Sequence, residues 1–219
     1  MKTVYEFPKS TEHKKVLPKN KIYEKAQPTT KVKQLFIDQV EKIEWSYVLA
    51  PESINLAKGK SIDEIQVFTI FLKSGTFSDE VLATIDKAIP SPILFMIKFN
   101  GKSQLVSCFK TLSTDKKKII IGSYFKSDWI ADNSERVKLP VALNMDGLYH
   151  QMLTSLSPVK KRKNETIEDW AQRYENLQSK LQEADRLEQK VNKEKQFNRR
   201  VELNHKLNTL KSEIKELEE

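Results

Sequence analysis

The residues with the most chemical potential lie in the stretch 62–73, which begins with two acids and ends with a lysine. Asp63, Glu64 and Lys73 are the residue types of a restriction-endonuclease-like site, in which two carboxylates hold a divalent metal beside a general base. That chemistry needs an acid two residues before the lysine, and Phe71 occupies the position. A metal-dependent nuclease or a nuclease-like DNA-binding protein with a degenerate core is therefore the alternative hypothesis, and we assign no catalytic residue.

The single cysteine, Cys108, does not indicate a second reactive site. It lies in the apolar run 105–109, where a small buried side chain is the simpler interpretation. A catalytic thiol needs a histidine, and His13, His150 and His205 are all distant in the sequence. One cysteine makes no internal disulfide or usual zinc knuckle, and the five glycines do not fall in the spacing of a phosphate-binding loop. We expect no metal and no cofactor.

The middle of the chain must position these residues, and its pattern predicts helices and strands in one domain. Apolar residues at helical spacing predict a helix over 32–49, stopped by Pro51. β-branched and aromatic residues predict a strand over 62–73, and Thr76 or Ser78 can cap a helix that ends before Pro90. A further helix, which carries apolar residues between 148 and 156, would begin at Asn144 or Asp146.

A β-hairpin is the clearest local signal in the sequence. Two strand-like runs, 93–99 and 102–112, flank the turn dipeptide Asn100-Gly101, and a third run follows at 119–125. Helices that cover one face of a small, mostly antiparallel sheet make an α+β domain, which we place at residues 34–157. A long C-terminal helical hairpin or coiled coil is expected after it.

The net charge of +8 is concentrated before this domain. Residues 1–33 hold nine lysines and three glutamates, with three prolines among them, so we expect a basic, extended N-terminal arm. Apolar residues such as Tyr5, Phe7 and Ile22 interrupt the arm, so parts of it can dock on the domain or on a partner. Lysine-rich segments neutralise phosphates without reading base sequence, although the same residues also serve as ordinary solvated surface. The residues predicted to contact nucleic acid are Lys14, Lys15, Lys19, Lys21, Lys116, Lys117, Lys118, Lys160, Lys161, Arg162 and Lys163.

The segment 158–219 is highly charged and, after Pro158, contains no proline. Thr166, which precedes Glu168 and Asp169, predicts the start of a helix. Two apolar stripes with alternating steps of four and three residues predict coiled-coil packing. The stripes are out of phase, which leaves open one helix whose seam changes neighbours or two helices folded into an antiparallel hairpin. The hairpin is favoured, although no glycine or proline marks its bend. The predicted partner-binding residues are Trp170, Tyr174, Leu177, Leu181, Leu203, Leu207, Leu210, Ile214 and Leu217.

Three segments resemble an uncharacterised prokaryotic family, the domain-of-unknown-function family numbered four-three-nine-one. They are residues 36–45 (FIDQVEKIEW), 86–95 (DKAIPSPILF) and 195–204 (KQFNRRVELN), and the similarity spans nearly the whole chain. The family carries no assigned catalytic residues. Its members are often encoded beside helicases and DNA methyltransferases in phage-defence or restriction-like clusters, so the resemblance implies an accessory subunit.

These observations predict a cytoplasmic protein, because no apolar run is long enough for a signal peptide or a membrane span. We expect a non-enzymatic accessory or adaptor subunit of a DNA-processing phage-defence assembly. Its protein partner, a helicase-like subunit or a second copy, would bind the C-terminal helices. Non-specific DNA contact is a further expectation.

Overall fold

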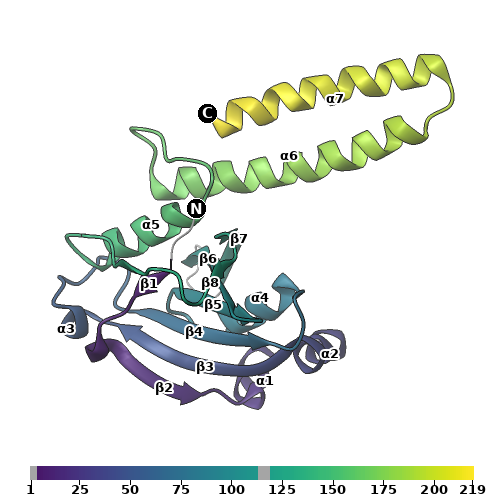
Figure 1. Ribbon diagram of the computed structural model, residues 1–219. Coiled ribbons are helices and arrows are strands. Elements are labelled where there is room, and N and C mark those ends of the chain that lie inside the picture. The colour runs from purple at the N-terminus through teal and green to yellow at the C-terminus, as the bar shows by residue number, and fades with distance from the viewer. Residues whose placement is uncertain (1–3, 113–118) are drawn as a thin grey trace. The chain divides into compact units, whose positions relative to one another are not determined.

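The structure is a computed structural model that describes residues 4–112 and 119–219. The chain divides into two compact units, residues 1–158 and 159–219, which we describe separately. Figure 1 labels most of their helices and strands. Within the described ranges, no helix combines the length and the apolar character needed to cross a membrane.

The first unit is built on a mostly antiparallel sheet in the order β2-β3-β4-β5-β6-β7, with β8 paired to β6. Only β4 and β5 run parallel among the neighbours on this path. A separate parallel pair joins β1 to β9. The strands are β1 (Tyr5–Glu6), β2 (Glu12–Val16), β3 (Val40–Leu49), β4 (Ile65–Leu72), β5 (Ile93–Phe99), β6 (Lys102–Leu112), β7 (Ile119–Lys126), β8 (Ile130–Ala131) and β9 (Val137–Lys138). This architecture confirms the predicted α+β class.

Local sequence accounts for the two central connections of the sheet. Parallel strands need a crossover, and α4 (Asp79–Ala88) supplies it between β4 and β5. The Ser78 hydroxyl caps this helix by accepting a hydrogen bond from the Glu80 amide at 3.2 Å. Asn100 and Gly101 have φ angles of 46° and 72°, as the predicted tight turn between β5 and β6 requires.

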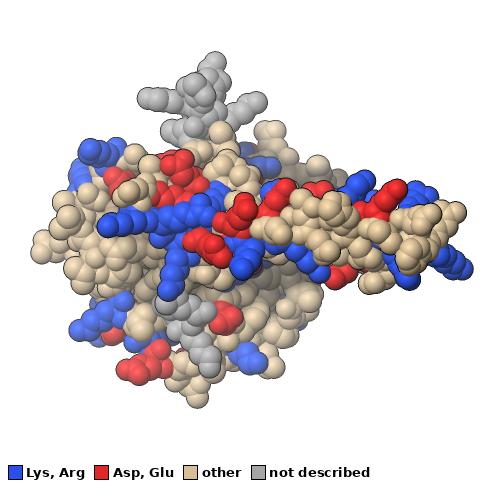
Figure 2. All heavy atoms as spheres, turned by 90° about the horizontal axis from the view of Figure 1, so that it is seen from above, with Lys and Arg blue, Asp and Glu red and all other residues tan. Residues whose placement is uncertain are grey.

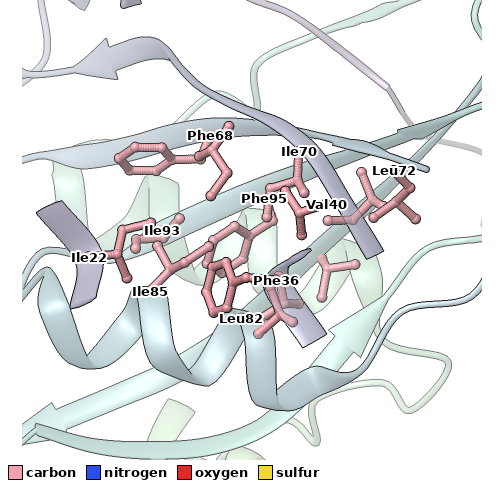
Figure 3. Close-up of a cluster of buried hydrophobic side chains, with 14 residues drawn as sticks. Ile22, Phe36, Val40, Phe68, Ile70, Leu72, Leu82, Ile85, Ile93 and Phe95 are labelled. Carbon is pink, nitrogen blue, oxygen red and sulfur yellow. The ribbon is translucent and has the colours of Figure 1, made fainter. Parts of the chain in front are cut away.

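A hydrophobic core lies between the sheet and α1 (Lys19–Ala26), α2 (Thr30–Gln39) and α4. Figure 3 shows Leu82 and Ile85 of α4 directed at Phe36 and Phe95. On the other side of the sheet, α5 (Met145–Leu156) packs against β6 and β7, as Figure 1 shows. Asn144 begins α5 as predicted, because its side chain accepts a hydrogen bond from the Gly147 amide at 2.9 Å. Both faces of β4 are consequently buried.

The N-terminal segment differs from the extended arm that we expected. Within the described residues it forms β1, the 3-10 helix η1 (Lys9–Thr11), β2 and α1, and it belongs to the first compact unit. Three of its apolar side chains, Tyr5, Phe7 and Ile22, are buried. Burial of these widely spaced residues orders a segment whose basic composition alone predicts disorder.

The predicted helix over 32–49 is correct only in its first half. Residues from Val40 onward form β3, and Pro51 begins the short helix α3 (Pro51–Ile54) instead of ending a long one. The register of β3 against β4 shifts twice, between Val40 and Lys42 and between Trp45 and Tyr47. Such bulges interrupt the two-residue alternation of a strand, so the buried positions recur every third residue and imitate a helix.

The second unit is a helical hairpin of α6 (Ile167–Lys193) and α7 (Phe197–Glu218). This confirms the hairpin alternative for the tail. Thr166 starts α6 as predicted, because its hydroxyl accepts a hydrogen bond from the Asp169 amide at 3.0 Å. The bend uses residues 194–196, and Glu194 and Gln196 have φ angles of −75° and −76°. The bend needs no glycine because these two backbone conformations are ordinary extended ones.

Candidate interaction surfaces

The residues of the nuclease hypothesis do not come together. Asp63 and Glu64 precede β4 and Lys73 follows it, so the eight-residue strand separates them by roughly 25 Å. The Ser91 hydroxyl donates to the Glu64 carboxylate at 3.1 Å, and the Lys73 ammonium donates to the Ile37 carbonyl at 2.6 Å. In the described part of the chain, no group of three or more His, Cys, Asp or Glu side chains is placed to hold a metal ion.

A buried polar cluster joins α4 to β6 and β7. The Lys110 ammonium lies 2.7 Å from a carboxylate oxygen of Asp86, and the two side chains are 4% and 0% exposed. The Tyr124 hydroxyl donates to the other oxygen of Asp86 at 2.5 Å. Lys110 also donates to the carbonyls of Ile89 and Ser91, both at 2.9 Å. Ion pair and hydrogen bonds together satisfy charges that would otherwise be costly to bury.

Electrostatics make this cluster a structural feature and not a reactive one. Burial raises the pKa of the Asp86 carboxyl, although the pairing with Lys110 acts against that shift. Burial also raises the pKa of the Cys108 thiol well above its ordinary value, so the thiol stays protonated and is a poor nucleophile. The Tyr149 hydroxyl of α5 donates to the Cys108 carbonyl, which ties this helix to β6. The predicted burial of Cys108 is confirmed.

Sequence reasoning missed this cluster, although one signal was available. Asp86 follows Leu82 by four residues, so it falls on the apolar face of α4. An acid on the inner face of a helix predicts a buried partner. Lys110, inside the apolar strand 102–112, is the matching cation.

Several lysines predicted to contact nucleic acid have internal partners. The Lys19 ammonium donates to the carbonyls of Phe36 and Val40 at 2.8 and 2.6 Å. Burial, and to a smaller degree the charge of Lys73, lowers the pKa of Lys19. Two other lysines form ion pairs within the N-terminal segment, Lys14 with Glu12 at 2.7 Å and Lys21 with Glu24 at 3.2 Å. Lys15 is exposed, and Lys116, Lys117 and Lys118 lie outside the described residues.

The basic run 160–163 lies where the hairpin is open. Arg162 donates through its guanidinium to the Glu216 carbonyl at 2.6 Å, so it satisfies the C-terminal turn of α7. Lys161 donates to the Glu165 carbonyl. Lys160 and Lys163 are exposed.

The two apolar stripes lie mostly inside the hairpin. Trp170, Tyr174 and Leu177 of α6 are buried, and so are three of the α7 residues. Leu181 departs from this pattern with 39% exposure, because the inner face of α6 continues through Ala184 and Val191 at steps of seven from Leu177. The remaining stripe residues are Leu207, Leu210 and Ile214, which are buried, and Leu203 and Leu217, which are half-buried.

Arg173 closes the open end of the hairpin, and sequence reasoning did not identify it. Its guanidinium binds both carboxylate oxygens of Glu165 at 2.6 and 2.9 Å. It also donates to the Leu217 carbonyl at 2.5 Å and to the Lys160 carbonyl at 2.8 Å. The Arg173 hydrogen bond holds the pKa of Glu165 at about 2. One side chain therefore links the start of α6 to the end of α7.

A groove of about 520 Å³ opens in the first unit, between the segment 6–9, α3 and residues 138–142. Beside it, Val141 and Leu143 are 94% and 91% exposed, and Val141 lines the groove. The charged residues of the lining are Lys9, Lys138 and Glu6, and Glu6 is the register partner of Lys138 in the β1-β9 pair. The apolar lining consists of Phe7, Pro8, Ile54, Leu56, Leu139, Pro140, Val141, Ala142 and Leu148.

We call Val141, Leu143 and this lining the apolar groove. Exposed apolar residues gathered at a concave surface are typical of protein interaction sites. Sequence reasoning missed it because residues 139–143 (LPVAL) have neither helical nor strand periodicity. The available signal was the uncharged apolar run itself, which lies between the strand predicted at 119–125 and the helix predicted to begin at Asn144 or Asp146.

Comparison with known proteins gives one result. The family model described as Domain of unknown function (DUF4391) matches residues 6–214. This match confirms the family resemblance of the sequence. No curated protein and no solved structure matches the chain.

Proposed function

The chain belongs to the DUF4391 family, and from that premise we propose that it is a non-enzymatic accessory subunit of a DNA-processing assembly of the phage-defence kind. It acts by binding a protein partner. The assembly type rests on the genetic neighbourhood of such families, beside helicases and DNA methyltransferases, and is an argument by association. The binding role rests on the surface of the first unit.

The observation that carries the binding role is the exposure of Val141 and Leu143 beside the apolar groove. Two aliphatic side chains left almost wholly in water gain about 1.5–3 kcal/mol each when a partner buries them completely. A concave, preformed apolar surface also receives the anchoring side chain of a partner without reorganisation. Val141 and Leu143, at 94% and 91% exposure, bury almost no surface in the core of this chain.

The charge around the groove indicates the chemistry of the partner segment. Lys9 and Lys138 line it, and both are exposed, whereas Glu6 is the one acid of the lining. A partner segment with apolar anchors and flanking acidic residues complements this surface. We therefore assign the main protein contact to the apolar groove. The apolar stripes of the C-terminal helices, the partner contact predicted from the sequence, stay a prediction.

Co-purification tests this proposal directly. The full chain is expressed with the protein encoded by the neighbouring gene, and the complex is followed by size-exclusion chromatography. We expect co-elution with the wild-type chain and loss of the complex with the V141D/L143D variant. Val16→Asp, which alters an exposed valine on β2, is the matched control and keeps the complex. Absence of any complex with the wild-type chain contradicts the proposal.

A further inference from the structure

We propose that the closed end of the C-terminal hairpin binds single-stranded nucleic acid. This site, the hairpin tip, comprises residues 190–202: the last turn of α6, the bend and the first turns of α7. The proposal does not rest on the protein contact at the apolar groove, which belongs to the other unit. It rests on charge, on the position of that charge along α7 and on one exposed aromatic ring.

Basic charge in the segment 158–219 is unevenly distributed, with one excess in the run 160–163 at the open end and a second at the tip. Residues 190–202 hold five basic side chains and two acidic ones, whereas the whole segment 158–219 holds fifteen and thirteen. In Figure 2, several Lys and Arg side chains project around the end of the hairpin at the right of the view. The five basic residues are Lys190, Lys193, Lys195, Arg199 and Arg200.

Helix stability explains only part of this charge. Lys190 and Lys193 lie in the last turn of α6, where cations favour the helix dipole. Arg199 and Arg200 lie at the start of α7, where the dipole disfavours them. The first turn of α7 contains no acid, and the side chain of Gln196 makes no capping hydrogen bond. In contrast, α4 and α6 each begin with two acids. The helix dipole effect of the two arginines therefore lowers the stability of α7. We expect such an unfavourable effect for residues whose role is to bind an anion.

The same end of α7 exposes an aromatic ring. Phe197 is 68% exposed and Val201, one turn later on the same face, is 51% exposed. Arg200, three residues after Phe197, falls on the same side of α7 as the ring. An exposed ring beside a cation is the combination on which unpaired bases stack while phosphates pair with the basic side chains.

The size of the tip favours a nucleic acid over a protein. A stable protein interface buries about 800 Å² on each side around an apolar centre, and lysine is depleted in such interfaces. The tip offers two apolar side chains, Phe197 and Val201, beside three lysines. Single-strand binding needs only backbone charge and stacking surface, both of which the tip supplies. Duplex DNA has no exposed base faces, so it would use the charge but not the ring.

One internal contact competes with the ligand. Arg199 lies 3.5 Å from Glu194, and its side chain is 70% exposed. The Glu194 carboxylate also accepts the Gln196 amide at 2.9 Å. The Glu194 side chain is only 20% exposed, but the ion pair is long and its arginine is mostly exposed, so a phosphate can share the guanidinium at little cost. Arg200 and Lys195, both exposed, complete the set that faces the backbone of the strand.

Fluorescence anisotropy of the full chain with a labelled twelve-nucleotide oligothymidylate tests the proposal. We expect the logarithm of the binding constant to fall with the logarithm of salt concentration with a slope of about −2 to −3, for three to four phosphate contacts. R199A/R200A should weaken binding at least tenfold and reduce the slope by about 1.4. Phe197→Ala and Phe197→Leu should both weaken it about tenfold, because leucine keeps the apolar volume but not the stacking face.

The controls make each outcome decisive. K206A/K215A removes two exposed basic residues of α7 outside the tip and should leave binding unchanged. An equal loss in this control overturns the proposal, since attraction would then follow net charge alone. Equal displacement by polyglutamate, or equal affinity for duplex and single strand with no effect of Phe197, also overturns it. Phe197 is mostly exposed, so its variants should fold, which circular dichroism checks.

Discussion

The ammonium of Lys73 donates a 2.6 Å hydrogen bond to the carbonyl of Ile37, in the last turn of α2. No basic residue of α2 itself lies in that turn, and the Lys19 ammonium donates in the same way to the neighbouring carbonyls of Phe36 and Val40. Two lysines from distant parts of the sequence therefore satisfy the negative end of one helix. The residue that suggested a nuclease is a helix-capping residue in this fold.

Lys73→Ala should destabilise the first unit slightly. We expect the wild-type chain to have no nuclease activity that this substitution could remove. The expected loss is about 0.5–1 kcal/mol, the usual value of a cation at a helix C-terminus. Urea denaturation followed by tryptophan fluorescence measures it, with Lys58→Ala as the control, since Lys58 is exposed. Cleavage of DNA by the wild-type chain with magnesium or manganese, abolished by Lys73→Ala, would contradict this account.

Replacing Lys110 with methionine should cost far more, about 3–5 kcal/mol. The substitution leaves the Asp86 carboxylate buried beside Tyr124 without its cation. D86N/K110M should recover a large part of this loss, because the amide stays neutral and still accepts the tyrosine hydrogen bond. The same denaturation experiment measures both variants. If the double variant is as unstable as the single one, the cluster is not held by its charges.

The hairpin should lose stability in acid through Glu165. Its folded pKa of about 2 lies below the ordinary value of 4.5, because Arg173 binds the carboxylate. A lowered pKa contributes stability that is complete above the ordinary value and disappears as the pH falls through the folded value. Thermal melts at 222 nm between pH 7 and pH 2 should show this decline in the wild type. Glu165→Gln should be less stable at pH 7 and show a flatter profile, and an unchanged profile would refute the assignment.

Two leucines of the predicted stripes should respond differently to truncation. Leu210 is buried between the helices, so Leu210→Ala should cost about 2–4 kcal/mol. Leu181 is 39% exposed, and Leu181→Ala should cost less than about 1 kcal/mol. Chemical denaturation monitored by circular dichroism compares the pair. Equal losses would mean that α6 presents a different face to α7.

Predictions from the sequence succeeded where the residues that determine a feature are close together in the chain. The turn at Asn100-Gly101, the caps at Ser78, Asn144 and Thr166 and the hairpin of the tail all depend on neighbouring residues, and all are confirmed. The prediction for the residues of β3 was wrong, because two bulges give this strand a three-residue burial period. These bulges arise only when β3 pairs with β4.

The candidate surfaces were less predictable than the fold. The positions of Asp86, Lys110 and Arg173 depend on contacts between residues 8 to 44 positions apart. The apolar groove combines segments near residues 6, 54, 140 and 148. Patterns along the chain report periodicity and capping, and they carry no record of which distant loops meet.

Binding to the apolar groove is the central claim, and isothermal titration of the full chain against the purified protein encoded beside it tests the claim most directly. The account predicts a saturable complex that V141D/L143D weakens at least a hundredfold and that Val16→Asp leaves unchanged. A complex of equal affinity with V141D/L143D and wild type would place the partner elsewhere and contradict the account.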